Sequence, residues 1–473
     1  MSWRIGMCTC ATIAGNDPQK WVTMESLLRT GRDLETKLGG SVTAADQNMG
    51  HLEEALRKGV VELQRQALEK AVQAKADGTP PRCPQCGEGL AKVTQAVERT
   101  VETRFGTIRY RRSYGWCRKC QHWCYPADVR LGLSANASAS PGLQEIAALS
   151  VSKMPVAEAA KVVERLSGIA ISPATLDREA RRQGQKGVEK RGQEDGKIQA
   201  GEARSGPEPA PECLVIELDA WNIRERDQWG KTERLRARGE EPGRWHWVYT
   251  GTCFGLDQRG KTSGGRAVIS GRGFVATRGG LDAFREQLWA EAMRQGLGQA
   301  KRVLVIADGA VWIWKLVADR FPEAEQRLDL WHATQYLWAV AQELHPDDAP
   351  QRKAWVKPLL RQLQRDQTVQ VIGRLEEVIE RLPSESKPSA RQAVAYLEEH
   401  APRMKYAAAR KRGEPVGSGA VESTCRQYQC RFKRPGQFWT TAGDEGLLSL
   451  ETFWRNGRWR ELFPHVDADF SRN

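Results

Sequence analysis

Apolar residues recur along this chain at two different spacings, and each spacing predicts a different kind of element. From residue 20 to about 77 they recur every three or four positions, as at Leu52 and Leu56, which predicts a helix with one apolar face. We expect that face to form a core or dimer contact within a helical N-terminal region over 1–80. Pro and Gly residues at 77–84 end the pattern and open a new unit.

Three further stretches precede the longest mixed region. Residues 81–130 alternate between apolar and polar positions and end in aromatic residues and arginines, which predicts strands. Residues 138–185 return to a helical pattern in two segments joined by a Gly-containing turn, which predicts a helix-turn-helix. Residues 186–211 are polar, rich in Gly and Pro and free of aromatic side chains, and this composition is typical of a linker.

The region after residue 212 combines strands with helices. Helical segments at 281–296 and 311–321 separate the third strand from the fourth and the fourth from the fifth. The five predicted strands lie at 213–221, 244–256, 265–277, 301–309 and 326–331. The order β-β-β-α-β-α-β is that of the RNase H-like fold, in which the first and fourth strands are neighbours.

We therefore predict an α/β protein with an RNase H-like catalytic core. The first part of the core covers 212–345, a helical insertion covers 346–412, and a closing helix with a C-terminal tail covers 413–473. A chain of 473 residues suits three or four domains, which agrees with this division.

The composition narrows the classes of function. An excess of 72 Lys and Arg over 59 Asp and Glu gives a net charge of +13, which favours a polyanion such as DNA or RNA as the partner. A merely basic protein would show the same excess. No run of 18 or more apolar residues exists, so we expect no membrane span, and the N-terminal residues lack the long apolar core of a secretory signal. We expect a cytoplasmic protein.

Three acidic residues stand where a metal-dependent nuclease centre needs them. Asp219 lies near the end of the first predicted strand, Asp308 at the end of the fourth, and Glu422 in the first turn of the last helix, which Ser418 could cap. Because the first and fourth strands are neighbours in this order, we expect the carboxylates to converge. Two Mg²⁺ or Mn²⁺ ions about 3.5–4 Å apart would activate the attacking oxygen and stabilise the departing one. Taken singly, each acid could equally be a helix cap or a solvated side chain.

Asp329 and His332 lie three residues apart, at the end of the fifth predicted strand and the start of a helix. A buried Asp-x-x-His beside a metal site could hydrogen-bond the scissile phosphate or orient a metal ligand. The alternative is a capping Asp and a structural His.

Four of the eleven cysteines form two C-x-x-C pairs. Cys83 and Cys86 precede the alternating segment, and Cys117 and Cys120 follow it. Zn²⁺ takes four thiolates in a tetrahedron, and a two-residue gap lets both sulfurs of a pair reach the ion. We therefore predict a zinc ribbon with one structural Zn²⁺ in this segment. Reduced structural thiols are the alternative, and Cys124 could compete as a ligand.

Basic residues are concentrated in three segments that could hold DNA. The ribbon carries ten basic against four acidic side chains over 82–130, and the segment 403–434 carries nine against two around Glu422. The second helix of the predicted helix-turn-helix carries three arginines and could enter a groove, although a packing module would show the same pattern. The predicted DNA contacts are Arg104, Arg109, Arg111, Arg112, Arg178, Arg181, Arg182, Arg426, Arg431, Lys433 and Arg434.

The pattern D…D…D-x-x-H…GSG-x-V-E, with a helical block before the Glu, resembles bacterial insertion-sequence transposases of the ISKra type. These are similar to the wider group of RNase H-like DDE transposases with a C/D-x-x-H motif, which includes Mutator and hAT elements. The resemblance covers roughly 81–440 and implies a helical insertion in the core, divalent metal and transposon-end DNA as substrate. By motif, it implies that the three acids bind the metal, while Asp329 and His332 support the scissile strand.

The sequence therefore predicts an insertion-sequence DDE transposase. Such an enzyme binds double-stranded DNA at the transposon ends, hydrolyses a phosphodiester and uses the freed 3′-OH to attack target DNA. We expect a homodimer or higher oligomer associated with the bacterial nucleoid. Two alternatives stay open: a domesticated DNA-binding protein without catalysis, and a general nuclease of the same fold, such as a resolvase or RNase H.

Overall fold

The computed structural model describes residues 29, 31–33, 35–36 and 48–466, apart from 136, 203–205, 208, 227, 229, 242, 383 and 385–386. Its contacts divide the chain into two compact units, Met1–Ser150 with Val156–Glu179, and Val151–Pro155 with Ala180–Asn473. The part of the predicted N-terminal helix that precedes residue 29 lies outside the described residues.

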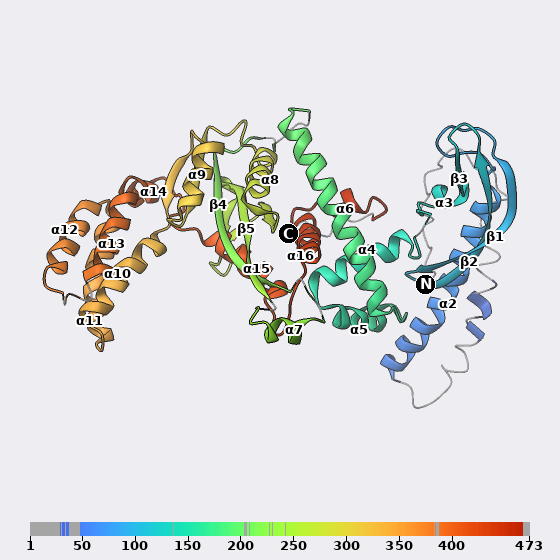
Figure 1. Cartoon of the computed structure of the whole chain (residues 1–473), viewed down its shortest axis with the longest axis horizontal. Helices are drawn as coiled ribbons and strands as arrows, with labels where there is room; N and C mark the ends of the chain where they lie inside the picture. Colours follow the sequence, from blue (N-terminus) through green and yellow to red (C-terminus); the bar gives the residue numbers. More distant parts are fainter. Residues whose placement is uncertain are drawn as a thin grey trace, which may run out of the picture. The chain divides into compact units, whose positions relative to one another are not determined.

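The first unit pairs a long helix with a three-stranded antiparallel sheet (Figure 1). Strands β1 and β2 form a hairpin, and the short β3 pairs with β2, so the strands predicted between the cysteine pairs are confirmed. The elements are α2 (Met49–Asp77), β1 (Ala91–Thr103), β2 (Gly106–Cys117), β3 (His122–Cys124) and α3 (Pro126–Arg130).

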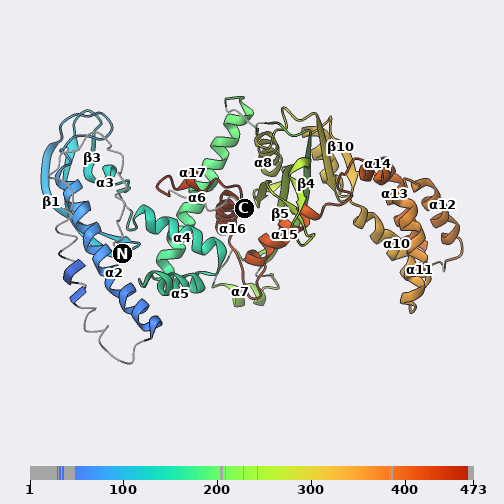
Figure 2. The same ribbon diagram turned by 180° about the vertical axis from the view of Figure 1, so that it is seen from behind.

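Helix α2 packs along β2, as both views show (Figure 2). Leu68, Val72 and Ala76 make this contact. The packed face therefore differs from the predicted one, since Leu56 of the predicted face is 50% exposed. The sheet packs against the C-terminal half of the helix. The spacing of apolar residues along the sequence does not indicate which part of a helix the sheet covers.

Three helices follow. They are α4 (Pro141–Lys153), α5 (Val156–Ser167) and α6 (Pro173–Gln199). Between α5 and α6 the chain turns at Gly168, whose φ is +77°, a conformation that glycine adopts without strain. The hydroxyl of Ser172 accepts a hydrogen bond from N of Thr175 at 3.1 Å and so caps α6. A helix, a turn and a helix thus lie where the sequence predicts them.

The predicted linker over 186–211 is wrong as far as residue 199, because α6 continues through it. Several of its polar side chains are buried in ion pairs. Arg191 pairs with Glu445 at 2.5 Å, and Asp195 pairs with Arg294 at 2.6 Å. The polar composition predicts solvated side chains and hence a linker. It does not reveal that tertiary ion pairs stabilise a helix here.

The second unit is built around a five-stranded mixed sheet of order β10-β9-β4-β5-β8 (Figure 1). Strand β5 is antiparallel to β4 and β8, while β9 and β10 run parallel to β4. The strands are β4 (Cys213–Glu225), β5 (Arg244–Gly255), β8 (Gly273–Thr277), β9 (Arg302–Ala307) and β10 (Glu325–Leu328). The predicted α/β class is confirmed, as is the prediction that the first and fourth strands, β4 and β9, are neighbours.

The third predicted strand, 265–277, is in fact two strands. Its second half is β8, and its first half contains β7 (Ala267–Ile269), which pairs with β6 (Arg259–Lys261) as a hairpin apart from the main sheet. Ser270, Gly271 and Arg272 separate the halves. The helices α7 (Thr232–Ala237) and η2 (Leu256–Gln258) complete this part of the chain.

Both faces of the sheet are covered. Helices α8 (Gly280–Arg294) and α9 (Val311–Arg320) pack on the face that carries Leu214 and Ile216. Helix α15 (Gly419–Phe432) contacts β4 and β5 on the face that carries Val215. Because side chains alternate along a strand, the odd-numbered residues of β4 face α15.

The predicted helical insertion consists of helices that pack on one another, as both views show (Figure 2). Within the predicted bounds 346–412 lie α11 (Ala349–Leu363), α12 (Thr368–Ile379), α13 (Lys387–His400), η3 (Ala401–Arg403) and α14 (Tyr406–Lys411). Helix α10 (Leu330–Leu344), which packs on α11 and α13, precedes these bounds and lies in the segment predicted as the first part of the core. After α15 come α16 (Thr441–Arg455) and α17 (Trp459–Leu462). Within the described part of the chain, no helix has both the length and the apolar character that crossing a bilayer would need.

Candidate active site

Three parallel strands bring three aspartates to one edge of the sheet. The β4–β9 pairing, continued by two residues beyond its last pair, places Asp219 opposite Asp308. The β10–β9 pairing, continued by one residue, places Asp329 beside Asp308, and N of Asp329 donates to the carbonyl oxygen of Ala307 at 2.8 Å. The carboxyl ends of parallel strands are a common place for ligand sites, because side chains from several strands meet there.

Asp219 and Asp308 are each fixed by a backbone hydrogen bond. Oδ1 of Asp219 accepts from N of Ala220 at 2.6 Å, and Oδ1 of Asp308 accepts from N of Ala310 at 2.9 Å. Burial raises the pKa of Asp219, and the negative charge of Asp308 raises it further. A carboxylate whose ionisation a neighbouring negative charge opposes is stabilised by a cation bound beside it.

Asp329 connects two helices through hydrogen bonds of its carboxylate. It is the N-cap of α10, where Oδ1 accepts from N of Trp331 at 2.5 Å. Its Oδ2 accepts from N of Ser418 at 2.8 Å and from the Ser418 hydroxyl. Burial by itself raises the pKa of Asp329, but His332 and Ser418 outweigh burial and hold the pKa at about 2. The carboxylate therefore ties the start of α10 to the start of α15.

His332 and Glu422 complete the centre with Asp329. One ligating atom from each of these three residues lies within 4.8 Å of the others. Nδ1 of His332 is 3.6 Å from Oδ2 of Asp329, an ion-pair distance, and Asp329 raises the pKa of His332, followed by the charges of Asp308 and Glu422. Glu422 lies in the first turn of α15 and is half-buried.

The convergence differs in detail from the prediction. Asp219 and Asp308 are neighbours as expected, but Glu422 lies closest to Asp329 and His332. Among the described residues, Asp219 and Asp308 are not part of the group whose ligand atoms lie within 4.8 Å. His332 links the two pairs, because its charge also affects the pKa of Asp219.

Ser418 occupies the N-cap position of α15, yet its side chain makes no capping hydrogen bond, so the predicted cap is wrong. The hydroxyl donates to Asp329 instead. The first turn of α15 is held by Glu217, whose Oε2 accepts from N of Val421 at 2.9 Å. Carboxylates are stabilised at this end of a helix because its free N–H groups and dipole are positive.

The sequence analysis did not select Glu217. This residue is 1% exposed, and burial raises its pKa to about 8, although the N–H groups of Val421 and Ala420 oppose the rise. The available signal was alternation, since Glu217 lies two residues before Asp219 and so on the same face of β4. An acid inside an otherwise apolar strand needs a buried partner, which here is the end of α15.

The predicted DNA contacts fall into two groups. Arg112 is buried against Asp128, with Nε 3.0 Å from Oδ1, and the guanidinium of buried Arg431 donates to the carbonyl oxygen of Val151. The prediction is wrong for these two, because their side chains are occupied inside the protein. The side chains of Arg104, Arg109, Arg111, Arg178, Arg181, Arg426 and Lys433 are exposed, and those of Arg182 and Arg434 are half-buried.

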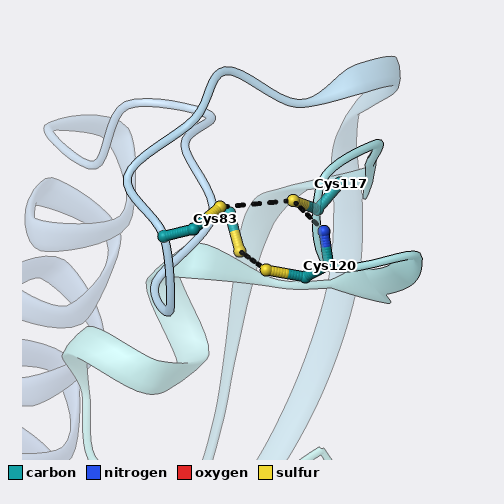
Figure 3. Close-up of side chains that lie close together, drawn as sticks. Cys83, Cys117 and Cys120 are labelled. Atoms are coloured by element: carbon teal, nitrogen blue, oxygen red, sulfur yellow. Dashed lines mark hydrogen bonds between the residues drawn. The ribbon is translucent and has the colours of Figure 1, made fainter.

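The four paired cysteines come together in the first unit, and Figure 3 labels three of them, Cys83, Cys117 and Cys120. Ligand atoms of Cys83, Cys86, Cys117 and Cys120 all lie within 4.8 Å of one another. The Sγ–Sγ distances are 4.0 Å for Cys83–Cys120 and 3.5 Å for Cys86–Cys117. A zinc tetrahedron with Zn–S bonds of about 2.3 Å has edges of about 3.8 Å, so the four sulfurs fit one Zn²⁺.

The acidity of these thiols agrees with a cation site. Burial by itself raises the pKa of Cys83, but the backbone N–H groups of Cys86 and Gln85 hold it at about 6. The neighbouring Cys86 thiol and burial raise the pKa of Cys120 to about 12. One thiolate therefore forms easily and further ones need a compensating charge, which a bound metal provides. A second group, Cys83 with His122 and Cys124, also lies within 4.8 Å, so Cys124 remains a competing ligand.

Two comparisons with known proteins give one match. The sequence model of the family described as Uncharacterised protein family (UPF0236) matches residues 46–463, which includes both cysteine pairs and every acid of the centre. A search of the curated proteins finds no match.

Proposed function

The chain belongs to the Uncharacterised protein family UPF0236, and we propose that it is the DNA transposase of an insertion sequence. In this proposal it binds double-stranded DNA at the transposon ends, hydrolyses a phosphodiester and joins the freed 3′-OH to target DNA. The resemblance to ISKra-type and other DDE transposases is the origin of the proposal, and the geometry of the second unit supports it.

The topology of the second unit supports an RNase H-like core. Numbered along the chain, the strands of its main sheet have the order 3-2-1-4-5, with the first three antiparallel and the last two parallel to the first. The helices α10 to α14 lie between the fifth strand and α15, where the resemblance places a helical insertion. The fold alone does not select a reaction, because one fold supports many activities.

The observation that carries the proposal is the alignment of Asp219 with Asp308 at the edge of the sheet, with Glu422 brought to the same centre by α15. Carboxylates are the ligands that Mg²⁺ prefers, and the raised pKa of Asp219, caused by burial and by Asp308, fits a site that holds a cation. Mg²⁺ held by these residues would supply activation of the attacking oxygen and charge neutralisation at the leaving one.

Asp329 and His332 take different parts in this proposal. Both oxygens of Asp329 accept backbone hydrogen bonds, so Asp329 positions α10 and α15 rather than reaching the substrate. His332, whose pKa Asp329 raises, would donate a hydrogen bond to an oxygen of the scissile phosphate. The cysteine cluster would hold one structural Zn²⁺, and the exposed arginines of the β1–β2 turn, of β2 and of α6 would contact the DNA backbone.

Cleavage of DNA that carries the sequences flanking the gene, in the presence of Mg²⁺ or Mn²⁺, tests the proposal. We expect Asp219→Asn, Asp308→Asn and Glu422→Gln each to abolish cleavage and strand transfer while DNA binding is retained, because each replacement removes a metal-binding charge without changing the shape. Asp282→Asn is the matched control, since Asp282 lies in the first turn of α8 and its side chain is 93% exposed.

Three outcomes would count against this function. Full cleavage by one of the three variants would remove that residue from the centre. Cleavage without joined products would favour a nuclease or resolvase of the same fold. DNA binding without any cleavage by the wild-type protein would favour a domesticated DNA-binding protein.

A further inference from the structure

A large cavity lies beside the centre, on the side of α15 that the proposed reaction does not use. Its volume is about 870 Å³, and it is enclosed by the β6–β7 hairpin, the segment from Gly413 to Gly419 and one face of α15. Apolar residues of β5 and of the hairpin, among them Phe254 and Ile269, form part of the wall. Ligand sites commonly have volumes of about 300–1,000 Å³, so this one could hold one or a few nucleotides.

The charged side chains that line the cavity are mostly basic. Four basic side chains line the cavity, namely Arg259, Lys261, Arg266 and Arg272. Among the described residues, none of the four forms an ion pair with a carboxylate, whereas arginines nearby in the chain, such as Arg302, do so. The acid in the lining is Glu217, whose buried carboxylate is engaged by the backbone of α15. An anion entering the cavity would therefore meet four basic groups and a single acid, Glu217, whose charge acts on Arg272.

Contacts with a carbonyl oxygen and an aromatic ring hold two of these guanidinium groups in place. Neither contact is with a carboxylate, so both groups can still bind an anion. Nη1 of Arg259 donates to the carbonyl oxygen of Gly413 at 2.9 Å. The guanidinium of Arg272 lies over the ring of Phe274, 4.8 Å from its centroid, and burial lowers the pKa of Arg272. A guanidinium whose charge is opposed by burial gains more from an anion than a solvated one does. Lys261 and Arg266, at the exposed hairpin, can adjust to a ligand.

Helix α15 adds neutral hydrogen-bonding groups. Ser423 and Gln427 are exposed, lie one turn apart and line the cavity. Gly419 leaves open space beside them, because a Cβ at this position would meet nothing within 4 Å. Ser423 directly follows Glu422, so the cavity and the acidic centre lie on adjoining faces of the same helix, which is only about 10–12 Å across.

We propose that this cavity binds backbone phosphates of the DNA strand that the adjoining centre acts on. It would therefore hold the strand a short distance from the reacting phosphodiester. A chain of phosphates can contact the basic groups of the hairpin and the neutral groups of α15 at once, whereas a single free phosphate reaches only some of them. The inference rests on the proposed function in taking DNA as the substrate.

The salt dependence of DNA binding tests this site. Each phosphate contact contributes about 0.9 to the slope of log K against log salt concentration for duplex DNA. We expect the double variant Lys261→Gln with Arg266→Gln to reduce that slope by about 2 for a labelled duplex, measured by fluorescence anisotropy. Neither side chain is buried, so the variant should fold, which its thermal unfolding will show.

The matched control is Lys353→Gln with Lys357→Gln, which removes the same charge from exposed positions of α11. We expect its slope to equal that of the wild type. An unchanged slope in the cavity variant, or an equal reduction in both variants, would overturn the phosphate site whether or not the protein cleaves DNA. A reduced slope in the cavity variant alone, in a protein that cleaves no DNA, would support the site and contradict the transposase.

A titration with inorganic phosphate tests whether the ligand of the cavity is a DNA strand or a free phosphate ion. Titration calorimetry of the wild-type protein at constant ionic strength should show no saturable phosphate binding at millimolar concentration. Saturable binding that disappears in the Lys261→Gln, Arg266→Gln variant would assign the cavity to free phosphate and overturn the strand.

Discussion

Glu414 lies just before α15 and gives a sharp test of how that helix is anchored. Its side chain is 0% exposed and is bound by three arginines, Arg302 at 2.6 Å, Arg327 at 2.7 Å and Arg412 at 2.7 Å. Glu325 binds the same three arginines at 3.1 Å, 2.7 Å and 2.7 Å, but its side chain is 37% exposed. The two acids therefore have the same partners and differ in burial.

The expected effect of Glu414→Gln follows from the acidity of the group. Burial by itself raises the pKa of Glu414, but Arg412, Arg302 and Arg327 outweigh burial and hold it at about 2, against an ordinary value of 4.5. That difference corresponds to about 3 kcal/mol at neutral pH. Because Arg302 and Arg412 are partly exposed, water screens part of it, and we expect a loss of about 2 kcal/mol. Glu325→Gln should lose less than about 1 kcal/mol.

Thermal unfolding followed by circular dichroism measures the loss. We expect Glu414→Gln to lower the Tm by roughly 4–8 °C at neutral pH. A carboxyl whose pKa is lowered by folding stabilises the protein above its ordinary pKa, and this contribution disappears as the pH falls through the folded pKa. The difference between wild type and Glu414→Gln should therefore be full above about pH 4.5 and vanish toward pH 2. Equal losses in the Glu414 and Glu325 variants, or a difference that does not change over this range, would refute the reasoning.

Two further predictions concern the metal cluster and a helix contact. Cys117→Ser should reduce bound zinc from about one equivalent to far less and destabilise the first unit, as elemental analysis and unfolding would show, whereas Cys430→Ser, at an exposed cysteine outside the cluster, should change neither. Gly184→Ala should destabilise the second unit by about 1–3 kcal/mol in urea unfolding, because its Cβ would lie 2.8 Å from the backbone of Gly446. Gly192→Ala, in the same helix with nothing within 4 Å, should instead stabilise it by up to about 1 kcal/mol, and equal effects would contradict the close contact.

The strands and the acids at their ends could be predicted from the sequence because both depend on short-range rules. Asp219 and Asp308 follow apolar runs, and parallel neighbours place their ends at one edge of the sheet. The length of α6 could not be predicted in this way. Arg191 and Asp195 look solvated in the sequence, yet they are buried in ion pairs with residues more than ninety positions away. Only the fold supplies those partners.

The candidate site shows the same division. Glu422 could be selected because a third acid was needed on the helix predicted to close the core, but its nearest neighbours depend on how α15 meets the sheet. That contact is made by Glu217, and one-dimensional patterns give no reason to prefer a buried Glu over the Asp two residues later. At Ser418 the sequence predicts a contact that the structure lacks. Ser418 has the residue type and the position of a helix cap, but its hydroxyl donates a hydrogen bond to Asp329 instead.

Four acids of this centre therefore divide by what their oxygens contact. Glu217, on β4, accepts a hydrogen bond from the backbone of the first turn of α15. Asp329, just after β10, accepts one from the backbone of the N-cap residue of α15. Among the described residues, Asp219 and Asp308 accept backbone hydrogen bonds only from Ala220 and Ala310, and the thiol of Cys425 lies 3.5 Å from Asp219, so both acids can still offer lone pairs to a ligand. Glu422 is carried by the helix that the first two acids hold. Its place at the centre is consequently set by two buried carboxylates on two strands, so a change at either should act on Glu422 through the position of α15 rather than through charge.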